Sequence, residues 1–168
     1  AIRGYGVRLT RLELSPSELS YFFPVFVEEM SRGGFLFHRA IHQLLEFGQI
    51  EGTPFYTSED VDGVDLRTLL VECRRQRVPL PIPCALFVAR EIAGALAYAH
   101  ARRWSSGESL GVLHGSILPQ KVFINTAGEV KVSGFGLFQA LYRVALLRRY
   151  IDEASVEYLA PETVASSM

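Results

Sequence analysis

The sequence predicts an α+β fold, in which a small strand-rich part is followed by a mainly helical part. Alternation in residues 7–12 and a hairpin pattern in residues 41–58 place strands in the first part. The Ala-rich residues 84–102 have the periodicity of a long packed helix and lie in the second part. We therefore predict two units, residues 1–61 and residues 62–168.

The composition is that of one folded domain. The 168 residues are 49% hydrophobic and 21% charged, which suits a packed core. A net charge of −1 gives no electrostatic reason to expect a nucleic-acid partner. We expect no membrane span and no signal peptide. Cys73 and Cys84 form no metal or disulfide pattern and are expected to be buried free thiols, which indicates a reducing, cytoplasmic location.

The first strand is predicted from its alternation, and the helix after it from the residues at its start and end. Alternation in residues 7–12 puts Arg8 and Thr10 on the same face of the strand. Ser15 followed by Pro16 is typical of a helix start, and we expect this helix to be interrupted at Pro24 and to end at the Gly33–Gly34 pair.

The next segments alternate between strand and helix. Residues 41–48 and 54–58 form the predicted hairpin, with its turn near Glu51 and Gly52. Residues 64–77 are predicted as one helix, which the proline-rich residues 78–83 separate from the long helix.

Two short motifs indicate a family. Residues 114–121 read His-Gly-Ser-Ile-Leu-Pro-Gln-Lys, and residues 134–136 read Gly-Phe-Gly. They resemble the H-R-D-x-x-x-x-N loop and the D-F-G turn of eukaryotic-like Ser/Thr protein kinases, in the form found in bacteria. Residues 160–162 match the A-P-E motif that closes the activation segment. The resemblance runs from residue 7 to residue 162.

The resemblance implies an incomplete two-lobe kinase-like fold. The N-lobe would lack its glycine-rich loop, and the C-lobe would end near A-P-E, so the chain looks like part of a longer domain. A C-lobe of this extent would leave an apolar surface for further chain or a partner to cover. The residues to which the resemblance gives a structural role are Glu29, His114, Pro119, Phe135, Gly136, Ala160, Pro161 and Glu162.

Glu29 falls at the position of the glutamate that pairs with the strand lysine of a kinase. The candidate cations near it are Arg8 and Arg11. The alternative is a solvated glutamate beside Glu28.

The positions that carry kinase chemistry are replaced. Thr10 stands for the strand lysine, Ser116 for the catalytic aspartate, Lys121 for the metal-binding asparagine and Gly134 for the metal-binding aspartate. A serine is a poor proton acceptor at neutral pH, and Mg²⁺ requires oxygen ligands. The resemblance therefore implies a pseudokinase: not an enzyme, with no catalytic residue, no metal site and no cofactor.

The adenine site of the kinase frame is predicted to be filled by Arg8 and Phe123, whereas the small Ser58 would open a pocket behind it. Arg8 stacking on a base is the alternative, and Lys121 would then replace the metal as the cation for phosphate. If a nucleotide binds, the residues expected around it are Arg8, Glu59, Val61, Lys121 and Phe123.

Residues 137–150 predict a basic amphipathic helix within the activation segment. Its candidate partner-binding residues are Leu141, Arg143, Val144, Arg148 and Arg149. The leading hypothesis is a catalytically inactive regulatory module or scaffold that binds a protein partner, with a larger assembly left open. A metal-independent nucleotide-binding switch is the alternative, and an active enzyme with chemistry rerouted through Lys121 or Ser116 ranks last.

Overall fold

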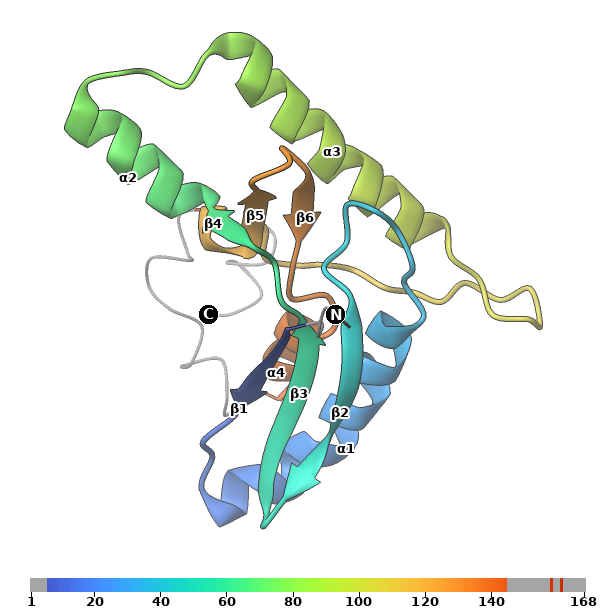
Figure 1. Ribbon diagram of the computed structural model, residues 1–168. Coiled ribbons are helices and arrows are strands. Elements are labelled where there is room, and N and C mark those ends of the chain that lie inside the picture. Colours follow the sequence, from blue (N-terminus) through green and yellow to red (C-terminus); the bar gives the residue numbers. More distant parts are fainter. Residues whose placement is uncertain (1–5, 145–157, 159–160, 162–168) are drawn as a thin grey trace, which may run out of the picture.

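The computed structural model describes residues 6–144, 158 and 161 and confirms the α+β class (Figure 1). Two antiparallel three-stranded sheets are present, with strand orders β1-β3-β2 and β4-β5-β6. The elements in chain order are β1 (Val7–Arg11), α1 (Pro16–Gly34), β2 (Leu44–Ile50), β3 (Thr53–Glu59), β4 (Gly63–Asp65), α2 (Leu66–Gln76), α3 (Ile82–Ala101), the 3-10 turn η1 (Pro119–Lys121), β5 (Val122–Asn125), β6 (Val130–Val132) and α4 (Leu137–Arg143).

The first sheet is built on the predicted strand and hairpin. β1 pairs with β3 so that Arg8 lies opposite Ser58. Glu51 and Gly52 both have positive φ, 49° and 80°, which suits a tight two-residue hairpin turn. β2 begins at Leu44 rather than at residue 41, because Ile41 is buried and bridges Val132 of the second sheet instead.

Helix α1 begins as predicted and does not break where predicted. Ser15 and Glu18 form a capping box at its start. The helix continues through Pro24 to Gly34, so the predicted interruption is wrong. Pro24 is exposed, and the buried Phe22 and Phe26 on either side of it hold the helix against the first sheet and α4.

The second sheet begins where a helix was predicted. Val64 lies in β4, paired with Ile124, and α2 starts only at Leu66 with Asp65 as its side-chain cap. A Cβ atom at Gly63 would overlap the main-chain carbonyl of Ile124, so this crossing requires glycine.

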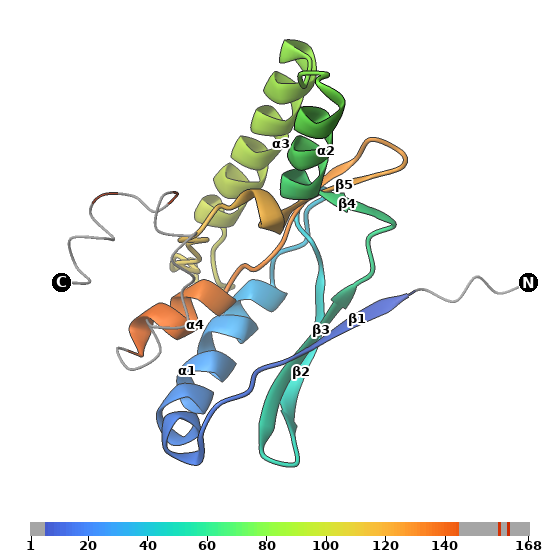
Figure 2. The ribbon, with the colours of Figure 1, turned by 90° about the vertical axis from the view of Figure 1, so that its left-hand side faces the viewer.

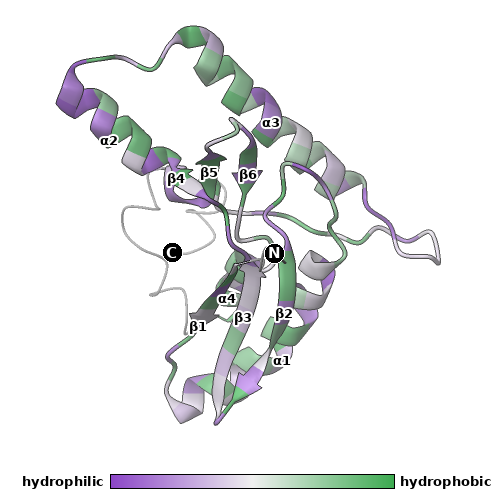
Figure 3. Cartoon of the chain, viewed as in Figure 1, coloured by the Kyte–Doolittle hydropathy of each residue, from purple (hydrophilic) through white to green (hydrophobic). Residues whose placement is uncertain are grey.

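Helix α3 is long and packs through one face. Its buried residues are Val88, Glu91, Ala95 and Ala99, whereas Leu86 is 65% exposed. Figure 3 shows the apolar residues continuing along α3. Within the described part of the chain, α3 is the one helix that is long and apolar enough to cross a membrane, by length and composition only, and the absence of a membrane span stays a prediction.

The two cysteines are free, as predicted, and neither is buried. Cys73 is half-buried and Cys84 is exposed at the start of α3. The expectation of buried thiols is therefore wrong.

Two apolar clusters join the parts of the chain. One brings Leu36 and Ile41, from the segment between α1 and β2, against Val132 of β6 and Phe135 after it. In the other, α4 packs on α1, alongside which it lies in Figure 2. The site described below lies where these connections meet. The boundary between residues 61 and 62 stays a prediction.

Candidate functional site

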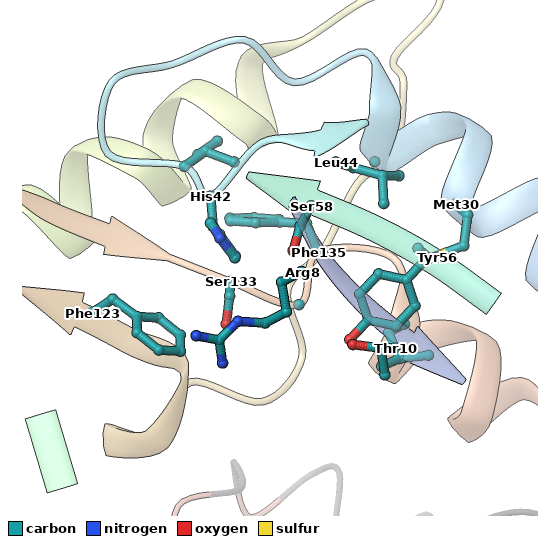
Figure 4. A pocket seen from close by; sticks show the side chains of 14 residues that line it. Arg8, Thr10, Met30, His42, Leu44, Tyr56, Ser58, Phe123, Ser133 and Phe135 are labelled. Atoms are coloured by element: carbon teal, nitrogen blue, oxygen red, sulfur yellow. The ribbon is translucent and has the colours of Figure 1, made fainter. Parts of the chain in front are cut away.

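A cavity of about 190 Å³ lies between the first sheet and the loop after β6 (Figure 4). β1 contributes Arg8 and Thr10, which lie on one face as the alternation predicts. The second sheet and the loop after it contribute Phe123, Ser133 and Gly134. This volume is below the roughly 300–1,000 Å³ that is typical of sites for drug-sized ligands.

The outer part of the cavity is occupied by a stack of the chain's own side chains. The Arg8 guanidinium carbon lies 5.6 Å from the centre of the Phe123 ring, and Figure 4 shows the side chain reaching toward that ring. The His42 ring also lies 5.6 Å from the Phe123 ring, centre to centre. Asp60 accepts a hydrogen bond from Arg8 at 3.5 Å and holds it in this direction.

His42 also occupies a main-chain acceptor. Its Nε2 donates a hydrogen bond to the Glu59 carbonyl at 2.5 Å. Burial lowers the pKa of His42, so the ring is neutral at neutral pH. The sequence analysis missed this residue. The signal that could have identified it was a polar histidine just before β2, at a position facing the cavity where an apolar residue would be expected.

The Glu59 side chain is committed as well. Lys131 Nζ donates to its carboxylate at 2.6 Å, and the main-chain N–H of Gln43 donates to the same carboxylate at 2.9 Å. Burial by itself would raise the pKa of Glu59, but these two hydrogen bonds lower it below its usual value. Val61, the next predicted nucleotide contact, is 8% exposed and lies in the core.

Ser58 is buried and lines the same cavity. Other residues that line it are Met30, Leu44, Tyr56, Phe135 and Leu137. A pocket opened behind Ser58 stays a prediction.

The loop that carries His114 is fixed from both ring nitrogens. His114 Nε2 donates to the Ser133 carbonyl at 2.9 Å, and Nδ1 accepts from the Ser116 amide at 3.3 Å. The ring also meets Phe135 edge to face at 4.7 Å. Burial, followed by the charge of Lys121, lowers the pKa of His114 to about 4. The histidine is a neutral structural anchor for the turn at Gly134–Gly136.

Lys121 extends to the glycine that replaces the metal-binding aspartate. An ideal Cβ at Gly134 would lie 3.7 Å from Lys121 Nζ, and this ammonium lies 5.7 Å from the centre of the Phe138 ring. Burial lowers the pKa of Lys121 to about 8. No carboxylate among the described residues forms an ion pair with it. One cation therefore stands at one of the two replaced metal-ligand positions and extends to the other.

The start of α4 covers this loop. Gly115 has a φ of 75°, and a Cβ on it would come within 2.5 Å of the Phe138 ring. Phe138 is 3% exposed. The glycine at residue 115 thus makes room for α4 to lie against the loop.

The described part of the predicted partner-binding helix packs against α1. Arg143 donates to Glu29 at 2.5 Å and pairs with Glu28 at 3.0 Å. Val144 is buried, and Leu141 packs in the same cluster with α1. These three residues are therefore committed within the chain. Arg148 and Arg149 lie outside the described residues.

Glu29 is neither solvated nor paired as predicted. It is 5% exposed and its cations are Arg143 and Arg32, not Arg8 or Arg11. The sequence did not predict this pairing, because the partner is 114 residues away on α4.

Some of the other motif positions lie among the described residues and some lie outside them. Pro119 opens η1 and Gly136 precedes α4 with a φ of 87°. Pro161 is exposed, whereas Ala160 and Glu162 lie outside the described residues. In the described part of the chain, no group of three or more His, Cys, Asp or Glu side chains is placed to hold a metal ion.

Comparison with known proteins identifies relatives. No protein-family model matches the chain. Tyrosine-protein kinase MasK of Myxococcus xanthus is 32% identical over 141 residues, covering 84% of this chain and 22% of the relative. Serine/threonine-protein kinase PknL of Mycobacterium tuberculosis is 30% identical over 168 residues, covering 96% of this chain and 39% of the relative.

A solved structure agrees. The PknI kinase domain of Mycobacterium tuberculosis superposes with a TM-score of 0.64 at 27% identity, covering 78% of this chain and 48% of that chain. The predicted fold class is confirmed by this match. The chain spans less than half the length of these relatives.

The relatives contradict one prediction. The replaced positions led to the expectation that the chain is not an enzyme. The relatives are named as Ser/Thr and Tyr protein kinases, which points to an enzyme, so that expectation is corrected.

Proposed function

Because the chain is a kinase-like protein related to the bacterial Ser/Thr and Tyr protein kinases, we propose that it acts as a kinase-fold regulatory module that binds a protein partner. Regulation by partner binding is compatible with the enzyme class of the relatives. We place this module in the cytoplasm.

One observation carries the proposal: the chain's own side chains take up the outer part of the central cavity. A planar ligand there would have to displace Arg8 from Phe123 and His42 from the Glu59 carbonyl. The first displacement breaks a contact of the half-exposed Arg8, and the second breaks a hydrogen bond of the half-buried His42. This cost supports a role carried by the outer surface of the module.

The test is recovery of a complex without nucleotide. The full chain, tagged and expressed in the source organism, is purified in EDTA without nucleotide and analysed by size-exclusion chromatography with light scattering. We expect a partner protein to elute with it at near-stoichiometric amount. A chain that elutes alone under these conditions, and forms a complex only when ATP and Mg²⁺ are added, contradicts the proposal.

A second candidate is nucleotide binding without metal, and the position of Lys121 favours it. Its ammonium lies beside Gly134 without a carboxylate partner among the described residues. A cation at this place would attract a phosphate group directly.

Lys121→Met tests this second candidate. ATP at tenfold its Kd stabilises a folded protein by about 1.4 kcal/mol, which for this size raises Tm by about 3–6 °C. We expect that rise in the wild-type chain in the presence of EDTA, and no rise in Lys121→Met. Arg103→Gln, on a surface loop, is the control and should behave as wild type. A flat melting temperature of the wild-type chain up to millimolar ATP rejects nucleotide binding.

A further inference from the structure

We propose that the central cavity binds a small carboxylic acid with a single aromatic ring, an inference that goes beyond the proposed partner binding. A volume of about 190 Å³ remains beside the stack of Arg8, Phe123 and His42 (Figure 4). An apolar cavity of roughly 150 Å³ is large enough to hold benzene. The remaining space therefore suits one ring with a small substituent, and an adenine nucleotide needs more room than this while the stack is in place.

The charge of the cavity selects an anion. Among the described residues that line it, Arg8 is the one with a charged side chain, because burial lowers the pKa of His42 and keeps that ring neutral. Arg8 donates one hydrogen bond to a described residue, Asp60, at 3.5 Å. Both side chains are about half exposed, so this pair is weak. A guanidinium has five N–H donors, and most of those of Arg8 are therefore available to a ligand.

The other charges that act on His42 are already paired with each other. Lys131 Nζ binds the Glu59 carboxylate at 2.6 Å, and neither residue is among those that line the cavity. Arg8 is therefore the group that an anion in the cavity would meet. The planar fork of a guanidinium matches the two oxygens of a carboxylate, which favours a carboxylic acid over an anion of another shape.

The uncharged part of the lining suits an aromatic ring. Among the described residues, Tyr56, Phe123 and Phe135 bring aromatic rings to the cavity. Met30 adds a thioether, which contacts aromatic rings favourably, and Leu44 adds aliphatic surface. Contacts between rings contribute beyond the burial of apolar area. An aromatic acid should therefore bind more tightly than an aliphatic acid of the same size.

Other small molecules match the cavity less well. Inorganic phosphate would lose its hydration against apolar side chains, with one cation to offset that loss. A neutral aromatic molecule would fill the same space and leave Arg8 without an anionic partner. The combination of one guanidinium, aromatic walls and limited volume favours an aromatic carboxylate.

The experiment titrates the full chain with benzoate in isothermal titration calorimetry, with benzamide as the neutral molecule of the same shape. We expect benzoate to bind at least tenfold more tightly than benzamide, because only benzoate makes charged hydrogen bonds with Arg8. Arg8→Met should weaken benzoate binding by about the same factor and leave benzamide binding unchanged. Arg11→Met removes the same charge from the opposite face of β1 and is the matched control, which should bind benzoate as the wild type does.

A second measurement locates the ligand without any substitution. In NMR spectra of the wild-type chain, benzoate should shift the main-chain amide signals of Gly33 and Gly134, which line the cavity. The amide signal of Gly107, in the loop between α3 and η1, should stay in place. Cyclohexanecarboxylate has the same charge and no aromatic ring, and it should bind severalfold more weakly than benzoate.

Four results overturn the inference: no binding of benzoate up to millimolar concentration, equal binding of benzamide and benzoate, equal losses in Arg8→Met and Arg11→Met, or amide shifts at Gly107 as large as those at Gly134. The complex of the preceding subsection is recovered without benzoate, so the two failures are distinguishable. A chain that recovers its partner and does not bind benzoate loses this ligand site and keeps the proposed function. A chain that binds benzoate and elutes alone keeps the ligand site and loses the proposed function.

Discussion

At the scale of single residues, the loop around His114 has kept its packing while the groups for metal binding have been replaced. His114 holds the Ser133 carbonyl and the Ser116 amide and packs against Phe135. Lys121 brings a positive charge near the same ring. Burial and then the charge of Lys121 favour the neutral imidazole and outweigh the hydrogen bond to the Ser133 carbonyl, so this histidine links folding stability to pH.

The sign of that link follows from the lowered pKa of His114. Below about pH 6.5 the unfolded chain takes up a proton at this residue, and the folded chain does so only near pH 4. Stability should therefore be retained above pH 6.5 and should fall by about 3 kcal/mol as the pH drops toward 4. Urea unfolding at several pH values measures this loss of the free energy of unfolding. In His114→Asn, the free energy of unfolding should change less between pH 6.5 and pH 4 than it does in the wild-type chain.

Direct titration provides the check if that variant folds poorly. In the wild-type chain, NMR signals of the His114 ring should remain those of a neutral imidazole at pH 5.5. A midpoint near 6.5 would contradict the structural explanation.

At the scale of elements, α1 and α4 form one unit although they are far apart in the sequence. Phe22 and Phe26 of α1 meet Ala140 of α4, and Arg143 of α4 reaches Glu29 of α1. The helix after the Gly-Phe-Gly turn is thus an internal support in its described part.

Arg143→Met tests this support. Glu29 is buried, and its hydrogen bond with Arg143 is shorter than the one with Arg32. Loss of the bond with Arg143 should lower the free energy of unfolding by about 1–2 kcal/mol. The loss is limited to this size because Arg143 is half-exposed and screened by solvent. Arg75→Met removes an exposed pair on α2 and should leave stability unchanged. Equal denaturation midpoints for the two variants would show that the Arg143 ion pair contributes nothing.

At the scale of the molecule, the two sheets are joined at the central cavity. Lys131 of β6 pairs with Glu59 at the end of β3, and Ile41 bridges Val132. The stack of Arg8, His42 and Phe123 also crosses between the sheets. The residues that narrow the cavity therefore also contribute to holding the two parts together.

Local sequence signals were sufficient to predict several elements of the fold. The capped start of α1, the Glu51–Gly52 turn and the alternation of β1 follow from short-range chemistry, because capping, positive φ and period two involve neighbours in the chain. The positions of Thr10, Ser116, Lys121 and Gly134 followed from motif order. Pro24 was misjudged because tertiary packing of α1 outweighs the local cost of a proline.

The sequence by itself determined which side chains stand at the replaced positions, since that depends only on order along the chain. Tertiary structure alone decided that Arg143 neutralises Glu29, that His42 binds the Glu59 carbonyl, and that Arg8 shares a cavity with Tyr56 and Phe135. Such pairings depend on how distant segments pack, and charge or hydrogen-bonding capacity in a sequence does not specify its partner.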